Sequence, residues 1–260
     1  MIRIGAVPYL NGKPLIYGLD RIAGIDVILE VPSRLAIMLE AKEIAVGLVS
    51  LAACFQNPAL RIIPGIGISC DGPAASVKLF YNGEINDIKN VALDSSSITS
   101  TTLVKVILSE VYGIEPVYTV MPPVLPAMLH TCDGAVLIGD PAMRIPSGRY
   151  KELDLGMAWH ELTGLPFVFA VWAANPDMVN PSLIEILTSA KAGGLAAIKD
   201  ICRTESERLD LPYDLCSGYL KRVMGYDLTD AHRQAMRLFR DKVIEHDIMD
   251  DPAALKMLGE

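Results

Sequence analysis

Apolar and polar positions follow two different periods along the first two thirds of the chain. Short apolar runs, several of them β-branched, predict strands, and apolar residues three or four apart predict helices between them. The predicted strands are 2–8, 25–31, 44–51, 61–69, 75–81, 90–93, 117–121, 134–138 and 165–174. The predicted helices of this region are 14–19, 34–43, 103–111 and 125–130. Because strands alternate with helices, we expect an α/β protein with parallel sheets.

The pattern changes after residue 176, where helical spacing replaces almost all strand signal. Helices are predicted at 182–198, 201–209, 213–223 and 229–246. The strand–helix region itself divides into two units, joined near residues 75–84 and again near 166–176. We therefore expect a chain that crosses over and returns, with one lobe of residues 1–83 plus 175–260 and a second lobe of residues 84–174.

Composition narrows the class of protein. Hydrophobic residues make up 51% of the 260 residues, enough for a sizeable core, and the net charge is −8, which argues against nucleic-acid binding. We find no convincing membrane span and no secretory leader at Met1. Five scattered cysteines without a CxxC pair predict structural thiols, and with them a cytoplasmic protein.

The run 94–102, between a strand and a helix, carries a side-chain hydroxyl at seven of its nine positions. A helix start offers free N–H groups and a partial positive charge, and the hydroxyls add further donors. The run therefore favours binding of a carboxylate or phosphate over simple N-capping, which needs only one or two such residues. No glycine-rich phosphate loop accompanies it, so a nucleoside triphosphate is not expected.

Other polar residues follow strand ends, where open α/β sheets bind their ligands. Asn11, after the first strand, can donate and accept hydrogen bonds at once, although an ordinary Asn-Gly turn explains it equally well. Asp140 is a candidate cleft acid or a helix cap. Three serines are candidates for the same cleft or plain turn residues: Ser50, Ser69 and Ser76. The scattered histidines and cysteines show no metal-ligand spacing.

Several motifs occur in a characteristic order. They are residues 5–15 (GAVPYLNGKPL), 46–50, 71–72 with 76–77, 93–97 with 99–100, 138–140, 154–156, Trp159 and 163–172. Each motif is weak alone, but the ordered set covers residues 1 to about 175. In this set the chain resembles the MqnA/MqnD family of menaquinone biosynthesis, and most closely its chorismate dehydratases of the futalosine route.

The resemblance implies a two-lobed, periplasmic-binding-protein-like (type 2) fold with the ligand between the lobes. It implies conversion of chorismate, a small dicarboxylate, to 3-[(1-carboxyvinyl)oxy]benzoate and water, with no metal and no organic cofactor. We expect Asn11 to be catalytic, by steadying the leaving hydroxyl. The expected substrate-binding residues are Tyr9, Ser50, Ser69, Ser76, Ser96, Ser97, Thr99, Ser100, Gly139 and Asp140. No partner beyond the small molecule is expected, neither nucleic acid nor membrane, and no oligomeric state is indicated.

One position departs from the family. Ile98 stands where the family often has an arginine, so another cation would have to meet a substrate carboxylate. The candidates are Lys13, Arg34, Lys78 and Arg144. The matched motifs also contain no obvious base, and we therefore expect that a carboxylate of the substrate itself can take the proton.

Two other functions fit the same fold. One is a solute-binding protein for a small organic anion, against which the absence of a leader and the unpaired cysteines count. The other is the sister enzyme of the route, 1,4-dihydroxy-6-naphthoate synthase, but the Tyr-Leu-Asn opening favours the dehydratase. A regulatory ligand-sensing lobe is a third reading, which lacks an attached DNA-binding segment.

Overall fold

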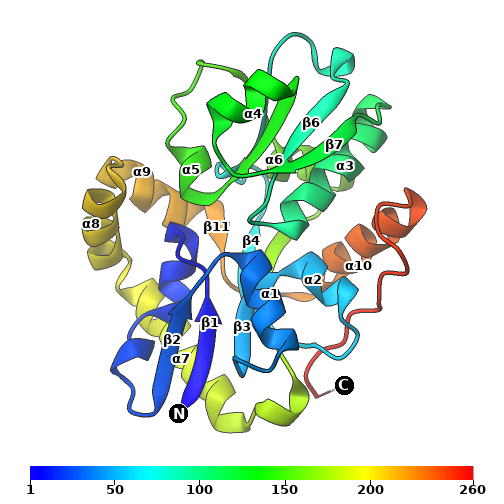
Figure 1. Ribbon diagram of the computed structural model, residues 1–260. Helices are drawn as coiled ribbons and strands as arrows, with labels where there is room; N and C mark the ends of the chain where they lie inside the picture. Colours follow the sequence, from blue (N-terminus) through cyan, green and yellow to red (C-terminus); the bar gives the residue numbers. More distant parts are fainter. Residues whose placement is uncertain (260) are drawn as a thin grey trace.

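The computed structural model, which describes residues 1–259, has two lobes, each built around its own sheet (Figure 1). The first sheet has the strand order β11-β4-β10-β3-β1-β2 and the second β7-β6-β8-β5-β9. The strands of the first are β1 (Ile2–Ala6), β2 (Ile25–Leu29), β3 (Val46–Ser50), β4 (Arg61–Cys70), β10 (Phe167–Ala174) and β11 (Met224–Gly225). Those of the second are β5 (Val77–Tyr81), β6 (Asn90–Asp94), β7 (Val117–Met121), β8 (Gly134–Ile138) and β9 (Lys151–Asp154).

Helices surround both sheets. The first lobe carries η1 (Leu10–Ile16), η2 (Leu19–Arg21), α1 (Pro32–Glu40), α2 (Leu51–Gln56), η4 (Pro176–Met178), α7 (Pro181–Ala196), α8 (Ile198–Leu209), α9 (Tyr213–Gly218), the π-helical turn η5 (Tyr219–Val223) and α10 (Asp230–Glu245). The second carries η3 (Ile85–Asp87), α3 (Ile98–Tyr112), α4 (Leu125–Thr131), α5 (Gly139–Met143) and α6 (Leu155–Thr163).

The sheets are mixed, so the prediction of parallel sheets is only partly right. β1 pairs in parallel with β2 and β3, and β6 with β7 and β8. β10 is antiparallel to β3 and β4, and β5 is antiparallel to β8 and β9. The reason is the route of the chain: β5 enters the second lobe and β10 returns to the first, and each runs against its neighbours.

The lobe boundaries expected from the sequence, 83/84 and 174/175, differ from the sheet pairing. β5 is hydrogen-bonded into the second sheet, and β10 lies between β3 and β4 in the first. The crossovers are therefore residues 71–76 and 164–166, several residues before each expected boundary. Both strands are apolar and buried, so the sequence shows that they are strands but not which sheet they join.

Capping residues decide where the helices begin. Helix α3 starts at Ile98, five residues earlier than predicted, because the Ser97 side chain accepts the backbone N–H of Ser100. Its end is Gly113, whose φ of +64° is the left-handed conformation of a helix C-cap. Half of the hydroxyl-rich run thus belongs to the helix itself.

The helical tail packs against both lobes rather than extending from one. Phe239 of α10 contacts Phe55, Trp159 and Phe167, with ring centroids 5.0–5.8 Å apart. Helix α7 packs so closely against η1 that a Cβ added at Gly194 would lie 2.0 Å from the carbonyl oxygen of Pro14. The tail therefore supports the turn that follows β1.

None of the helices within residues 1–259 is long and apolar enough to cross a bilayer.

Candidate active site between the lobes

A small cavity of about 40 Å³ lies where the carboxyl ends of β1, β3 and β8 approach one another. Its lining residues are Val7, Tyr9, Asn11, Pro32, Ser50, Ile68, Val77, Ser97, Ser100, Ile138, Gly139, Phe169 and Ala170. A larger hollow of about 500 Å³ on the first lobe, beside Lys13 and Glu205, includes none of the predicted site residues. The small cavity is therefore the candidate active site. It has room for a few water molecules, so a ring-sized ligand requires the lobes to separate.

The structure brings part of the predicted set onto the cavity surface. These residues are Tyr9, Asn11, Ser50, Ser97, Ser100 and Gly139. They come from both lobes and from segments up to 130 positions apart, which meet because the chain crosses over between β4 and β5 and returns through β10.

Asn11 lies on η1, the first turn after β1. Asn11 is one of the residues that line the cavity, and its Oδ1 atom is buried without a hydrogen-bond partner. The Asn11 amide lies beside the buried hydroxyl of Tyr219, whose pKa is raised by burial. A buried carbonyl oxygen without a partner is costly, so the Asn11 amide is a candidate for completion by a ligand.

The start of α3 supplies the hydroxyl groups. Ser97 Oγ caps the helix and lies 3.2 Å from Ser100 Oγ, to which it donates, and 3.4 Å from Ser50 Oγ of the other lobe. All three side chains line the cavity. Helix dipole and hydroxyl donors therefore converge on one point, the arrangement that favours an anionic group of a ligand.

Asp94 and Tyr9 hold the loop before that helix. Asp94 is 2% exposed and accepts the N–H groups of Ser96 (2.8 Å) and Ile138 (3.2 Å). Burial raises the pKa of Asp94, and burial also raises the pKa of Tyr9 to about 12, a shift that the neighbouring Ser96 opposes. Tyr9 is therefore a neutral hydrogen-bond donor at the cavity wall.

Asp140 connects the lobes from behind the lining. Its Oδ1 accepts the backbone N–H of Leu10 at 2.9 Å, and its Oδ2 lies 3.7 Å from Arg208. Burial raises the pKa of this carboxyl. The preceding Gly139 has a φ of +63°, and a Cβ there would lie 2.9 Å from the Tyr9 ring. Asp140 was expected to be a cleft acid or a helix cap, but it lies inside α5 without capping it and does not line the cavity. Its carboxylate instead bonds the backbone of Leu10 in the other lobe.

The remaining predicted residues also lie off the cavity surface. Thr99 Oγ1 accepts the N–H of Ala52 (3.0 Å), which joins α3 to α2, and Ser96 lies beside the Tyr9 hydroxyl. Ser76 Oγ is 2.7 Å from the hydroxyl of Tyr219. None of these three residues is part of the cavity lining.

Ser69 is the one candidate that the structure places elsewhere. Its neighbour Ile68 lines the cavity, and because successive strand side chains point to opposite faces, Ser69 points away. Its Oγ donates to the Gly225 carbonyl (3.2 Å) and lies 3.1 Å from Nε2 of His232. The expectation that Ser69 contacts substrate is not supported by this placement.

Comparison with known proteins adds the family. The family model described as menaquinone biosynthesis matches residues 2–245. The chain belongs to the menaquinone biosynthesis family. A Thermus thermophilus protein named chorismate dehydratase is 30% identical over 257 residues, covering 92% of this chain and 93% of that protein. The resemblance drawn from the ordered motifs is thereby confirmed.

Solved structures show the fold of this family member. A protein from Archaeoglobus fulgidus superposes with a TM-score of 0.75 at 16% identity, covering 95% of this chain and 98% of the other. The periplasmic aliphatic sulphonate binding protein SsuA from Escherichia coli superposes with a TM-score of 0.65 at 14% identity, covering 96% of this chain and 94% of the other. The predicted two-lobed periplasmic-binding-protein-like fold is confirmed.

In this member of the menaquinone biosynthesis family no lining residue of the cavity carries a formal charge. Ile98 is half-buried and packs against the core. None of the four candidate cations lines the cavity. Lys13 forms an ion pair with Glu205 (3.2 Å), and Lys78 forms one with Glu152 (2.9 Å). Arg144 bonds the Leu209 carbonyl, and Arg34 is exposed on α1. A carboxylate in this cavity would therefore be met by hydroxyls and N–H groups.

Two features of the site were missed from the sequence. One is the apolar wall, whose members carry no polar group that would mark them and lie, except for Pro32, in predicted strands: Val7, Pro32, Ile68, Val77, Ile138, Phe169 and Ala170. The other is Tyr219 of the helical tail, which lies beside the Asn11 amide and which no local motif marks.

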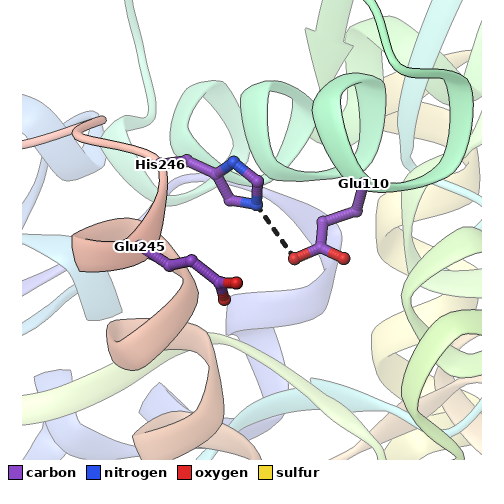
Figure 2. Close-up of side chains that lie close together, drawn as sticks. All are labelled: Glu110, Glu245 and His246. Carbon is purple, nitrogen blue, oxygen red and sulfur yellow. Dashed lines mark hydrogen bonds and ion pairs between the residues drawn. The ribbon is translucent and has the colours of Figure 1, made fainter.

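A group of metal-ligand types lies outside the cavity (Figure 2). Glu110 of α3 converges with Glu245 and His246 at the end of α10, and His246 Nε2 is 2.9 Å from Glu110 Oε1. Lys242 bonds the same carboxylate oxygen, and with His246 it lowers the pKa of Glu110. Because an ammonium already takes the oxygen that a cation would need, we interpret the group as an ion pair joining α3 to α10.

Proposed function

We propose that this protein is a chorismate dehydratase, a lyase that converts chorismate to 3-[(1-carboxyvinyl)oxy]benzoate and water without metal or organic cofactor. The observation that carries the proposal is the meeting, in one cavity, of the α3 N-terminus with Asn11, whose amide oxygen has no partner. The 30% identical relative named chorismate dehydratase, which is matched over 93% of its own length, supports it.

The α3 start is assigned to substrate binding. Chorismate has a ring carboxylate and an enolpyruvyl carboxylate, and Ser97 and Ser100 offer hydroxyl donors beside the positive end of the helix dipole. Ser50 adds a hydroxyl from the opposite lobe. Hydrogen bonds to a charged group contribute about 1.5–3 kcal/mol each, so a few of them can replace the absent arginine at position 98.

Asn11 is assigned to the reacting hydroxyl. Its amide, which has both a donor and an acceptor, can hydrogen-bond the ring hydroxyl and fix the direction in which the carbon–oxygen bond breaks. The apolar wall around it, which includes Phe169 and Ile138, excludes water from the ring.

The proton balance needs one base. The ring proton beside the enolpyruvyl ether passes to the base, and its C–H electron pair forms the new double bond. The neighbouring hydroxyl leaves with the electron pair of its carbon–oxygen bond and takes that same proton from the protonated base, so water departs and the base is regenerated. No histidine, lysine or carboxylate lines the cavity within the described residues, and the nearby Asp94 and Asp140 are bound to backbone amides. The enolpyruvyl carboxylate of the substrate is the base of this proposal, and aromatisation drives the step.

The test is to incubate the purified protein with chorismate and follow ultraviolet absorbance and mass. Loss of one water with an aromatic spectrum is the expected result. If chorismate raises the melting temperature but is not converted, the protein is a binding protein for organic anions and not an enzyme. If chorismate has neither effect, the substrate of 1,4-dihydroxy-6-naphthoate synthase becomes the next to try.

The location proposed with this function is the cytoplasm. All five cysteines are free and buried, which suits a reducing compartment. Burial raises the pKa of each of these thiols, so they are kept as unreactive packing groups.

A further inference from the structure

Helix η1, the turn that carries Asn11, has little support of its own. It is a 3₁₀ helix, whose hydrogen bonds have poorer geometry than those of an α-helix, and Pro14 inside it has no N–H group to donate. Within the part of the chain that the structure describes, its N-cap residue Tyr9 makes no side-chain cap bond. The N–H of Leu10 is bonded instead to Asp140 Oδ1 of the second lobe, at 2.9 Å. The position of Asn11 therefore depends on contacts from outside the turn.

A buried carboxylate holds the turn on the other side of Asn11. Glu205 of α8 is 6% exposed, and its Oε1 lies 3.2 Å from Nζ of Lys13. Its Oε2 accepts a hydrogen bond from Nε of Arg208 at 2.7 Å, and the Arg208 guanidinium lies 3.7 Å from Asp140 Oδ2. A glutamate is rarely buried so deeply unless cations pair with it, and here two do. These four charged side chains form the η1 charge network, which holds the chain on both sides of Asn11.

The η1 charge network includes residues of both lobes. Asp140 belongs to α5 of the second lobe, and Glu205 and Arg208 belong to α8 of the first. The contacts of Asp140 with the first lobe are therefore complete only when the lobes are closed, whereas the pair of Glu205 with Lys13 lies within one lobe. None of the four side chains is part of the cavity lining, so the network can act on a ligand only through the turn.

We propose that the η1 charge network positions the turn bearing Asn11 and completes its placement when the lobes close. The inference rests on the proposed dehydratase function for its catalytic consequence. Asp140, Arg208 and Glu205 are thus positioning residues, and without them the Asn11 amide would spend less time at the reacting hydroxyl. Binding of the substrate carboxylate at the α3 start does not pass through the network, so the effect should fall on kcat and not on KM.

Glu110 offers a matched control for Glu205. Its carboxylate also has two basic partners on another element, Lys242 and His246, and its side chain is 19% exposed. Glu110→Gln and Glu205→Gln each remove one partly or fully buried negative charge and leave the size of the side chain unchanged. Only Glu205 reaches η1, because Glu110 joins α3 to α10 away from the cavity.

The kinetic test compares the network variants with the control and the parent protein. Glu205→Gln and Asp140→Ala should each lower kcat about 10- to 100-fold with KM within about 3-fold of the parent, because a slight misplacement of a reacting group has effects of this size. Asp140→Asn, which keeps a side-chain oxygen for the Leu10 N–H, should retain more activity than Asp140→Ala. Glu110→Gln should keep the parental kcat. Parental kcat in both network variants, a loss confined to KM, or an equal loss of kcat in Glu110→Gln would overturn the proposal.

A second measurement does not depend on turnover. The N–H of Gly12 bonds the Tyr9 carbonyl within the turn (3.0 Å) and touches no member of the network, so its hydrogen exchange reports how firmly η1 is held. Glu205→Gln should speed this exchange at least about 10-fold, and Glu110→Gln should leave it at the parental rate. Parental exchange at Gly12 in Glu205→Gln would refute the positioning role. If the parent protein fails to turn over chorismate, the dehydratase proposal falls, and hydrogen exchange alone decides for or against the network.

Discussion

Asn11 combines two properties that rarely occur together in a buried amide, an unpaired oxygen and a place on a cavity wall. An unsatisfied buried acceptor destabilises a fold by about 1–3 kcal/mol. A folded chain retains such a group when a ligand completes it. Removal of the Asn11 amide should therefore lower activity far more than it changes stability.

Replacing Asn11 by alanine tests this separation. Asn11→Ala should reduce kcat at least about 100-fold, because the amide that hydrogen-bonds the ring hydroxyl is gone. The melting temperature should stay within about 3 °C of the parent, since the lost oxygen has no partner in the folded protein. Turnover assays and a thermal melt on the same sample measure both, and unchanged turnover would remove Asn11 from the mechanism.

Gly139 carries a second prediction at this scale. An alanine there would hold a positive φ and place its Cβ 2.9 Å from the Tyr9 ring. Gly148→Ala is the control, because Gly148 has a φ of +78° but open space around it. In both variants backbone strain should lower the free energy of unfolding by about 1 kcal/mol. Only Gly139→Ala should also weaken substrate binding, because its Cβ displaces Tyr9. Equal KM values in the two variants would contradict the proposed place of Tyr9.

Among the elements, α3 has both a structural and a binding role at one end. Ser97→Ala should cost about 1 kcal/mol of stability through the lost cap, and should raise KM about 10-fold through the lost hydroxyl. Ser109→Ala, on the same helix, removes a hydrogen bond to His246 far from the cavity. An unaltered KM in Ser97→Ala would argue against anion binding at this helix start.

Helix α10 begins with a capping box that depends on an uncharged imidazole. Nδ1 of His232 accepts the N–H of Thr229, and Nε2 then donates to Ser69. Burial lowers the pKa of His232 from 6.5, although Asp71 and Asp227 oppose the shift. Because the unfolded chain binds the proton more readily, the free energy of unfolding should fall as pH drops below about 6.5.

Urea unfolding between pH 7.5 and pH 5 measures this effect. His232→Gln should show a shallower fall in unfolding free energy than the parent over that interval. His130→Gln, which removes an exposed histidine at the end of α4, should keep the parental slope. Parental slopes in both variants would mean that the α10 cap does not sense pH.

The sequence predicts where the strands lie better than it predicts which strands pair with one another. β3 and β10 could be predicted because every residue in them is buried, which leaves an unbroken apolar run. β9 (Lys151–Asp154) could not, because it is a short edge strand with charged side chains, and α6 follows it without a separating turn. Ser69 shows the same limit within the site, because its face of β4 depends on a strand register that tertiary pairing decides.

For the whole molecule, the lobes are joined by hydrogen bonds at the cavity rim. The N–H of Leu10 reaches Asp140, and the N–H of Ala52 reaches Thr99. Since a ring-sized ligand does not fit the closed cavity, these bonds must open for entry. Hydrogen exchange at both amides should be faster than within the β3–β10 pairing, and saturating product should slow it. If these two amides exchange as slowly as the amides of the β3–β10 pairing in the free protein, the lobes do not open.

Tyr219 meets Ser76 across 143 positions of sequence. The second sheet is complete once residue 154 has been translated, but the first sheet still lacks β10 and β11 at that point. At about 5–20 residues per second, the ribosome needs roughly 7–30 seconds to pass from Ser76 to Tyr219. A nascent chain therefore carries its serine-rich helix start early, and we expect the Ser76–Tyr219 hydrogen bond to form only as synthesis nears its end.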